Sequence, residues 1–490
     1  MGAHWQRSVR RVHEVWSRTP PLSIEAIGIA RASFGVAFVI VMARLFPVLR
    51  DLYSDDGVAP SPIFSASDPW RWTAMFMGAP GCLYVVWSIG LVAAASLCVG
   101  WYSRASALVS FLAFSAIGER NLIVFEGADA IVRTVLFWSI LMPTGAAYSI
   151  DATLRRRAGL APPTFRLLPA RLLQLALAWI YFASFVEKLS DSAWRNGTAL
   201  HYALSLPHSE TRAMFVGLAN HPFVYVPGTY ATLAFEALFG VLVWLPFAQP
   251  YARRAALISG ILFHLGIATL MRVGNFSIVM LSLYPLWLDP AWARSVGERI
   301  FGDAAATRQP QGYEPKTWRK VVSLVAIALA LAGLWTTMPA ALERVLPVAP
   351  RPLALFTSTL WRQGQWRMFV PMTRYDGWLE ARGQFGDGAS VDVFREGLRG
   401  GSILPSPTEN DRFRLYERTA AYDGEFVGSS LAAFICRRWN KDTLGRESRL
   451  ERVDLFRYSI KVSLDAKQDA EALVTRVASV RCDSSSKARH

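Results

Sequence analysis

Apolar runs long enough to cross a lipid bilayer recur over the first two thirds of the chain, and they restrict what it can fold into. A transmembrane α-helix needs about 20 consecutive apolar residues, and a soluble domain of ordinary composition does not repeat such runs. The composition agrees, because 52% of the 490 residues are hydrophobic and only 18% are charged. We therefore predict an all-α polytopic membrane domain of about eight or nine transmembrane helices, at residues 28–49, 81–101, 105–118, 130–148, 170–189, 229–248, 254–272, 275–289 and 319–338.

Basic residues cluster in every second connection between these spans: Arg104; Arg155, Arg156, Arg157, Arg166 and Arg171; Arg253 and Arg254; Arg294, Arg299, Lys316, Arg319 and Lys320. Cytoplasmic loops concentrate Lys and Arg, so these connections are predicted to be cytoplasmic. They also account for the net charge of +15, and no nucleic-acid partner is expected. Abundant arginine and alanine favour a bacterial source, and hence a bacterial inner membrane with the lipid bilayer as the constant partner.

The same pattern divides the chain into domains. Residues 1–27 form a basic cytoplasmic N-terminal segment that lacks the apolar core of a signal peptide. Residues 28–290 form the main transmembrane domain, 291–318 a cytoplasmic linker and 319–338 the last transmembrane helix. Nine spans place the two termini on opposite sides, so residues 340–490 are predicted to be periplasmic.

The segment 340–490 is predicted to be a small mixed α/β extracytoplasmic C-terminal domain. Residues 378–385 and 389–394 alternate around Gly386-Asp387-Gly388, which is typical of a β-hairpin. Another strand is predicted within 449–464, and short amphipathic helices within 411–422 and 429–439. Cys436 and Cys482 either form a disulfide or remain buried thiols, and no metal site is expected, because no Cys/His cluster with ligand spacing occurs.

Polar side chains inside the apolar run 170–189 are the first indication of a functional site. At about 100° per residue, Gln174, Tyr181, Ser184 and Lys188 share one narrow face of a helix, while Glu187 points elsewhere. A face of this polarity is expected to line a cavity or to pack on another polar helix. Further candidates in other spans are Arg133, Glu236, His264, Arg272 and Asn275.

Each candidate also has a structural interpretation. Lys188 and Arg272 lie near predicted span ends, where long basic side chains reach the lipid headgroups. Glu236 and Arg133 can neutralise one another, and His264 can be a packing residue. In the functional interpretation, partial desolvation disfavours the charged form of Lys188, and the neutral amine then accepts a proton from a lipid-soluble weak acid such as a hydroquinone.

Two segments of the chain resemble a known membrane family. The first is Tyr181-Phe-Ala-Ser-Phe-Val-Glu-Lys188-Leu189 with Trp194, Gly197 and Ala199, and the second is Phe263-His264 with Gly274, Phe276-Ser277 and Val279-Met280-Leu281. Both resemble the vitamin K-dependent gamma-carboxylase and its bacterial relatives with a horizontally transferred transmembrane (HTTM) domain. Those enzymes convert protein glutamate to gamma-carboxyglutamate with reduced vitamin K, oxygen and carbon dioxide.

The resemblance implies a site for reduced quinone in the membrane domain. Lys188 matches the lysine that deprotonates the hydroquinone, and His264 is the second candidate catalytic residue. The candidate cofactor-binding residues are Tyr181, Ser184, Glu236 and Phe276. We therefore expect a quinol-dependent, carboxylase-like enzyme that acts on an exported protein or peptide. The alternative is a membrane-anchored, non-enzymatic assembly or maturation partner of an exported protein.

Overall fold

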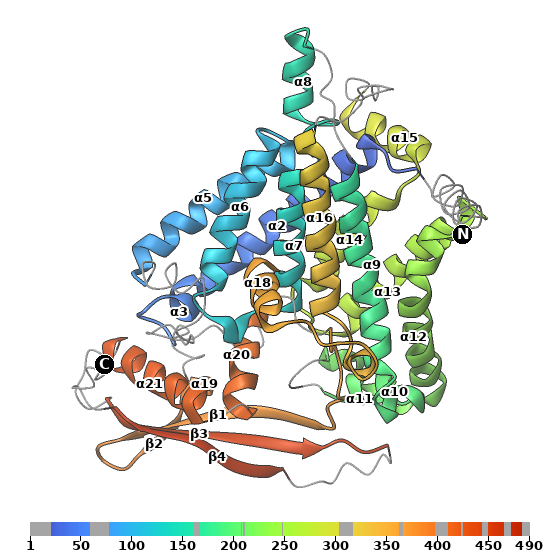
Figure 1. Cartoon of the computed structure of the whole chain (residues 1–490). Coiled ribbons are helices and arrows are strands. Elements are labelled where there is room, and N and C mark those ends of the chain that lie inside the picture. The colour runs from blue at the N-terminus through green and yellow to red at the C-terminus, as the bar shows by residue number, and fades with distance from the viewer. Residues whose placement is uncertain are drawn as a thin grey trace.

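A long helical bundle and a small antiparallel sheet make up the computed structural model of the protein (Figure 1). The structure describes residues 21–58, 78–160, 167–206, 208, 211–246, 248–302, 317–361, 366–396, 410–422, 425–442, 449–464 and 472–482. Most of the N-terminal segment 1–27, and residues 303–316 of the linker 291–318, therefore lie outside the described residues. Lys316 and the side chains of Arg319 and Lys320 are among them.

The predicted spans correspond to helices α2 (Ile24–Leu45), α5 (Pro80–Val99), α6 (Ser103–Gly118), α7 (Gly127–Leu141), α9 (Leu168–Lys188), α12 (Pro222–Trp244), α13 (Tyr251–Leu270), α14 (Phe276–Leu283) with η4 (Tyr284–Trp287), and α16 (Thr317–Thr336). In the described part of the chain, five helices are long and apolar enough to cross a membrane: α2 with its extension to Tyr53, α5, α9, α12 and α13. Shorter apolar helices lie at Ser103–Gly118, Phe276–Trp287 and Val321–Thr336. The chain is thus mostly helical and of membrane type, as predicted.

Helix boundaries follow local chemistry. Helices α5 and α12 have proline in the first turn, where no backbone N–H is required. Helix α5 ends at Gly100, whose φ of 73° is a left-handed C-cap. The predicted span 229–248 was wrong at its start, because α12 begins at Pro222 and continues through Pro227. Proline inside a helix removes one backbone hydrogen bond, so the sequence pattern suggested a later start.

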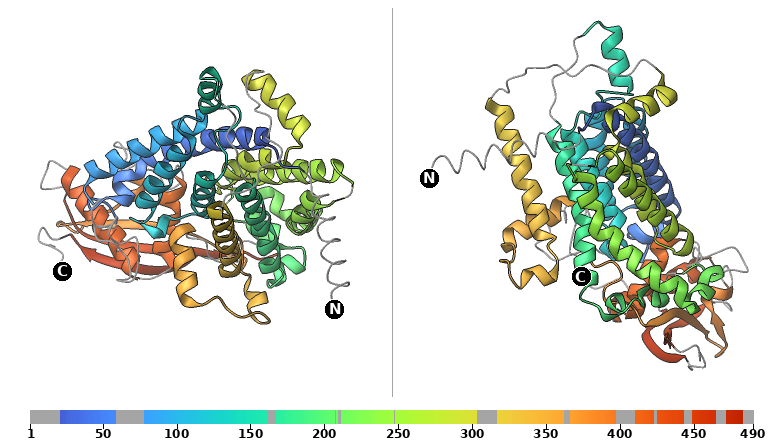
Figure 2. Two further views of the ribbon diagram at one scale, coloured as in Figure 1. Left: turned by 45° about the horizontal axis from the view of Figure 1, so that its top comes forward. Right: turned by 90° about the vertical axis from the view of Figure 1, so that its right-hand side faces the viewer.

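The bundle has two distinct ends. Helices α8 (Ile150–Arg157) and α15 (Pro290–Phe301), which carry the arginine clusters, lie at the end remote from the sheet (Figures 1 and 2). Helices α10 (Ser192–Arg195) and α11 (Ala199–Leu204) lie at the other end, beside the C-terminal domain. The remaining short elements are η1 (Phe46–Val48), α3 (Leu49–Tyr53), η2 (Leu122–Val124), η3 (Ala213–Asn220), α17 (Ala340–Glu343) and α18 (Arg351–Trp361).

The C-terminal domain contains a four-stranded antiparallel sheet with strand order β2-β1-β3-β4. The strands are β1 (Tyr375–Phe385), β2 (Ser390–Asp392), β3 (Leu450–Lys461) and β4 (Leu473–Arg481), and the helices are α19 (Val393–Glu396), α20 (Asp411–Tyr422) and α21 (Glu425–Asp442). Helices α20 and α21 lie between the sheet and the bundle (Figure 1). The hairpin, the strand within 449–464 and both amphipathic helices are confirmed, whereas β4 was not predicted.

Cys436 on α21 and Cys482 after β4 form a disulfide, with their Cα atoms 5.2 Å apart. This settles the open alternative in favour of the bond. A cross-link over 46 residues restricts the unfolded chain. Replacing both cysteines with alanine should therefore lower the free energy of unfolding of this domain by about 2–4 kcal/mol.

Thermal unfolding followed by proteolysis of the C-terminal domain measures this effect. Cys82→Ala is the matched control, because Cys82 is a free, exposed cysteine. A domain equally stable with and without a reductant would contradict the prediction.

Candidate functional site

Lys188 lies in the last turn of α9 and is buried, with only 2% of its surface exposed. Its Nζ donates to Ser184 Oγ at 2.5 Å, one turn earlier, and to Glu236 Oε1 on α12 at 2.8 Å. Ser184 Oγ also donates to Glu236 Oε1 at 3.2 Å. The ammonium lies 5.0 Å from the ring centroid of Trp194, an additional cation–π contact. The side chain therefore points into the bundle, which excludes the alternative interpretation in which Lys188 reaches the lipid headgroups.

His264 on α13 belongs to a second polar group, which also contains Tyr181 and Tyr284. Its Nε2 lies 2.7 Å from Tyr181 Oη on α9, and that hydroxyl lies 3.0 Å from Tyr284 Oη. His264 has no exposed surface. The three rings form a continuous hydrogen-bonded chain that joins α9, α13 and η4, so the structure brings the candidate residues Tyr181 and His264 together.

Glu236 Oε2 and His264 Nδ1 are buried and have no hydrogen-bond partner among the described residues, and the same holds for Trp287 Nε1, whose ring packs on Tyr284. An unpaired buried acceptor or donor costs free energy, so such atoms are rare in native structures unless a ligand or water satisfies them. Aromatic rings surround the two groups: Phe235, Phe239, Phe263, Phe276, Tyr284 and Trp194. The unpartnered atoms of Glu236 and His264 are therefore candidates for contact with a ligand or a water molecule.

The structure corrects one predicted ion pair. Arg133 does not neutralise Glu236, because its Nη1 donates to Glu119 Oε1 at 2.6 Å and its Nη2 to the carbonyl of Thr359. Both partners are almost fully buried. Arg133 therefore joins α7 to the loop before it and to α18, and it is not part of the Lys188 cluster.

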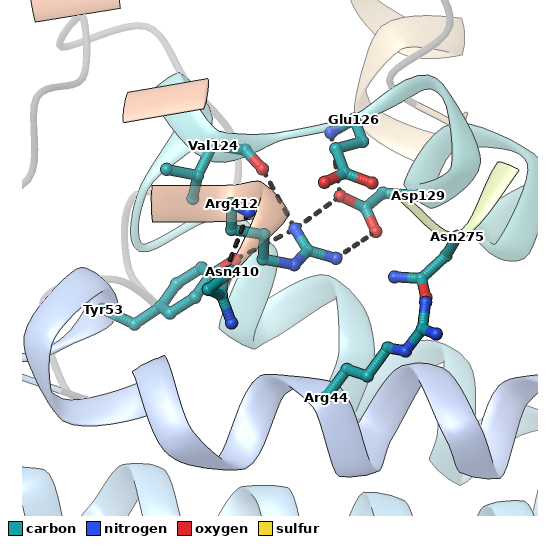
Figure 3. Close-up of polar contacts among 8 residues, drawn as sticks. All are labelled: Arg44, Tyr53, Val124, Glu126, Asp129, Asn275, Asn410 and Arg412. Atoms are coloured by element: carbon teal, nitrogen blue, oxygen red, sulfur yellow. Dashed lines mark hydrogen bonds and ion pairs between the residues drawn. The ribbon is translucent and has the colours of Figure 1, made fainter. Parts of the chain in front are cut away.

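The remaining candidates lie around the cluster rather than in it. Gln174 shares the face of α9 but binds the carbonyl of Leu286 at 2.7 Å. Glu187 points away from Lys188, as predicted, and accepts from the backbone of Ala340 at 2.7 Å. Asn275 Oδ1 accepts from Arg44 at 2.9 Å, which ties α14 to α2 (Figure 3).

A second buried charged group, the Arg412 cluster, attaches the C-terminal domain to the bundle (Figure 3). Arg412 of α20 donates to both carboxylate oxygens of Asp129, at 2.8 and 2.6 Å. It also donates to Tyr53 Oη at 3.1 Å and to the carbonyl of Val124 at 3.0 Å. Its partners come from α3, η2 and α7, so one side chain holds three membrane-domain elements.

Above α14 the bundle and the C-terminal domain enclose a pocket of about 820 Å³, which we call the interdomain pocket. Phe276 lines its floor, and the Phe276 ring also lies against the ring of His264, with centroids 5.5 Å apart. Phe369 lines another wall, and its carbonyl accepts from Trp194 Nε1 at 3.0 Å. Single aromatic side chains therefore separate the pocket from the polar groups in the bundle.

Glycine shapes one wall of this pocket. Gly274 has a φ of 59°, and a Cβ there would lie 2.5 Å from Glu126 Oε2. Only glycine adopts this conformation without strain while leaving room for the carboxyl group. Burial raises the pKa of Glu126 to about 7, with Asp129 and Asp411 adding to the shift and Arg412 opposing it.

A family model described as "HTTM domain" matches residues 20–292, more than half of the chain. The chain belongs to this family. The relationship to the vitamin K-dependent gamma-carboxylase is a general property of HTTM proteins, so the predicted resemblance is confirmed at the level of the family.

A curated relative of this HTTM protein is "Uncharacterized protein YitO" of Bacillus subtilis (strain 168). It is 31% identical over 123 residues, which are 24% of this chain and 38% of that protein. The chain therefore matches well under half the length of this relative. No solved structure matches the chain.

Sequence reasoning missed two parts of the site in this HTTM protein. Tyr284 extends the Tyr181–His264 pair, but it sits in a short apolar stretch with no distinguishing signal. Arg412 was placed on an amphipathic helix, yet its distance from Asp129 along the chain, 283 residues, hides the contact. An alternation of charge on a predicted helix does not identify which charge will be buried.

Proposed function

We propose that this HTTM protein is a quinol-dependent, carboxylase-like membrane enzyme whose proton acceptor is the buried pair of Lys188 and Glu236. The observation that carries the proposal is this ion pair, 2.8 Å long, beside the unpartnered Glu236 Oε2 inside an aromatic enclosure. A charged pair is costly to bury away from water. Its presence in a membrane bundle supports a chemical role.

The pair acts as a unit. The pair can exist as the Lys188 ammonium with the Glu236 carboxylate, or as the neutral amine with the neutral acid. Both forms contain the same number of protons, so either form can accept one more. Lys188 is then an ammonium and Glu236 a neutral acid, and the pair gains the positive charge that balances a newly formed anion. Ser184, which contacts both groups, orients them.

A reduced quinone supplies a weakly acidic hydroxyl and two electrons when it is bound. The residues that would hold it are Tyr181, Ser184, Glu236 and Phe276, with His264 Nδ1 free to bind a second oxygen. Aromatic walls exclude water, which strengthens electrostatic interactions inside the site and protects reactive species. The fit rests on the two orphaned polar atoms among the aromatic rings.

We further propose nine spans, a cytoplasmic N-terminus, and a periplasmic C-terminal domain in a bacterial inner membrane. The arginine-bearing helices α8 and α15 lie at the end opposite the sheet, which supports this orientation. The disulfide between Cys436 and Cys482 supports an oxidising compartment for the domain. The acceptor would then be an exported protein or peptide on the periplasmic side of the membrane.

Quinone binding tests the proposal directly. Wild-type protein and the Lys188→Met and Glu236→Gln variants would be purified, extracted, and analysed for quinone by mass spectrometry, and binding of added reduced phylloquinone would be measured under anaerobic conditions. We expect wild-type protein to bind it and each variant to bind at least about tenfold more weakly, since a charge-assisted hydrogen bond contributes about 1.5–3 kcal/mol.

The matched control is Lys461→Met, because Lys461 is an exposed lysine at the end of β3. Its quinone binding should equal that of the wild type. Wild-type protein that neither contains nor binds quinone, or a Lys188→Met variant with unchanged binding, would refute the proposal.

A second candidate function is a non-enzymatic partner in the assembly or maturation of an exported protein. It is favoured by the interdomain pocket, which is open enough to admit a segment of another chain. Copurification of one protein in stoichiometric amount, unchanged by Lys188→Met and without quinone, would support this alternative.

A further inference from the structure

We propose that the interdomain pocket is a binding site for the headgroup of an anionic amphiphilic lipid, with Arg272 as its main cationic contact. This inference does not depend on quinone chemistry at Lys188. It rests on the position of the pocket, on the pairing of the charges that line it, and on its apolar walls.

The pocket lies where the bundle ends. Its floor includes Phe276, at the start of α14, and its roof includes Trp378 of β1 in the C-terminal domain. A helix that crosses a bilayer ends at the level of the lipid headgroups. A cavity at this level is therefore within reach of a lipid from the surrounding leaflet.

Arg272 lines the pocket without a counter-ion among the described residues. Arg414 is bound to Asp411 Oδ1 at 3.0 Å and to the carbonyl of Arg272 at 2.6 Å. Arg367 pairs with Glu187 at 3.5 Å. The half-buried guanidinium of Arg272 makes no hydrogen bond or ion pair with any residue that the structure describes, although it lines the pocket.

Two carboxyl groups in the pocket do not supply the missing negative charge. Glu417 is only 9% exposed and has no hydrogen-bond or ion-pair partner within the described residues. Burial raises its pKa well above the ordinary value, although Arg414 opposes the shift. Burial also raises the pKa of Glu126, to about 7, and its Oε2 has no hydrogen-bond partner among the described residues. The rise in pKa favours the protonated form of both groups, and a protonated carboxyl donates a hydrogen bond to an anion rather than repelling it.

The walls favour an amphiphile over a small anion. The pocket is lined by the apolar side chains of Phe125, Phe276, Phe369 and Leu415. The ring of Phe276 also contacts the ring of His264 inside the bundle. Burying a hydrocarbon chain against these apolar side chains would make binding more favourable. Inorganic phosphate has no such chain. An oxyanion on Arg272 with an acyl chain along these rings matches both the charge and the surface.

The test uses the full chain in a neutral detergent with four probes: dioctanoyl phosphatidylglycerol, dioctanoyl phosphatidylcholine, inorganic phosphate and a short acidic peptide. Binding is measured by native mass spectrometry and by the shift in the thermal unfolding midpoint. We expect one phosphatidylglycerol to bind per chain and to raise the midpoint, whereas the choline lipid and phosphate do so at least tenfold more weakly. Arg272→Gln should weaken phosphatidylglycerol binding at least tenfold.

The control is Arg299→Gln, which removes an exposed arginine from α15 at the opposite end of the bundle. It should bind phosphatidylglycerol like the wild type. Equal binding of both lipids, equal protection by phosphate, unchanged binding in Arg272→Gln, or tighter Arg272-dependent binding of the acidic peptide would each overturn the inference. Failure here would leave quinone retention at Lys188 unaffected, so the two proposals are distinguished.

Discussion

Replacing Arg412 with methionine should release the C-terminal domain from the membrane bundle while both parts keep their internal structure. Arg412 is 5% exposed and Asp129 is 2% exposed, and they are joined by two hydrogen bonds shorter than 3 Å. Removing one partner of a buried ion pair typically costs about 3–5 kcal/mol, because the other charge remains buried without compensation. The cost falls on docking, since the two groups belong to different domains.

Electrostatics keep the guanidinium of Arg412 charged. Burial alone works against a charged guanidinium, but the attraction of Asp129, Tyr53 and Glu126 outweighs it and raises the pKa of Arg412 well above the ordinary value. Arg412 thus remains charged at every pH at which the protein folds.

Limited proteolysis and amide hydrogen exchange in α20 measure the docking of the domain. Arg449→Met is the control, because Arg449 is exposed at the start of β3. The double variant Arg412→Met with Asp129→Leu should recover part of the loss, since it leaves no uncompensated charge. A double variant whose loss equals the sum of the two single losses would show that the pair is not coupled.

The bundle and the main polar cluster were largely predictable, because each depends on short-range regularity. Span positions follow from apolar runs, and the shared face of Tyr181, Ser184 and Lys188 follows from the helical repeat. The same regularity gave α20 at its observed bounds. These features require no knowledge of which helices are neighbours.

Pairings between distant elements were not predictable in the same way. Glu236 was available to either Arg133 or Lys188 from sequence alone, and the choice depends on α9 packing against α12. Strand β4, Leu473–Arg481, carries alternation too weak to distinguish it from a loop, and it is stabilised by pairing with β3 and by the disulfide. The interdomain pocket forms only where the two domains meet, and contacts such as that of Arg412 with Asp129 join residues far apart in the sequence.

Single substitutions of Lys188 or Glu236 should cause the second large loss of stability. Comparison with the double variant distinguishes a role in ligand binding from a role in folding. Lys188→Met leaves the Glu236 carboxylate buried, and Glu236→Met leaves the ammonium buried with only Ser184 and the Trp194 ring as contacts. Each single variant should lose about 3–5 kcal/mol of stability. The double variant Lys188→Met with Glu236→Met should recover most of it, because two apolar side chains of similar volume require no desolvation of charge.

Thermal unfolding of the four proteins in detergent, together with quinone binding, completes this double-mutant cycle. A double variant that is as stable as the wild type but does not bind reduced phylloquinone would mean that folding does not require the charges. The two charges would then be required for ligand binding, since an apolar pair would stabilise the bundle equally well. A double variant as unstable as the single variants would instead assign the pair to helix packing. It would remove the reason to regard Lys188 as a proton acceptor.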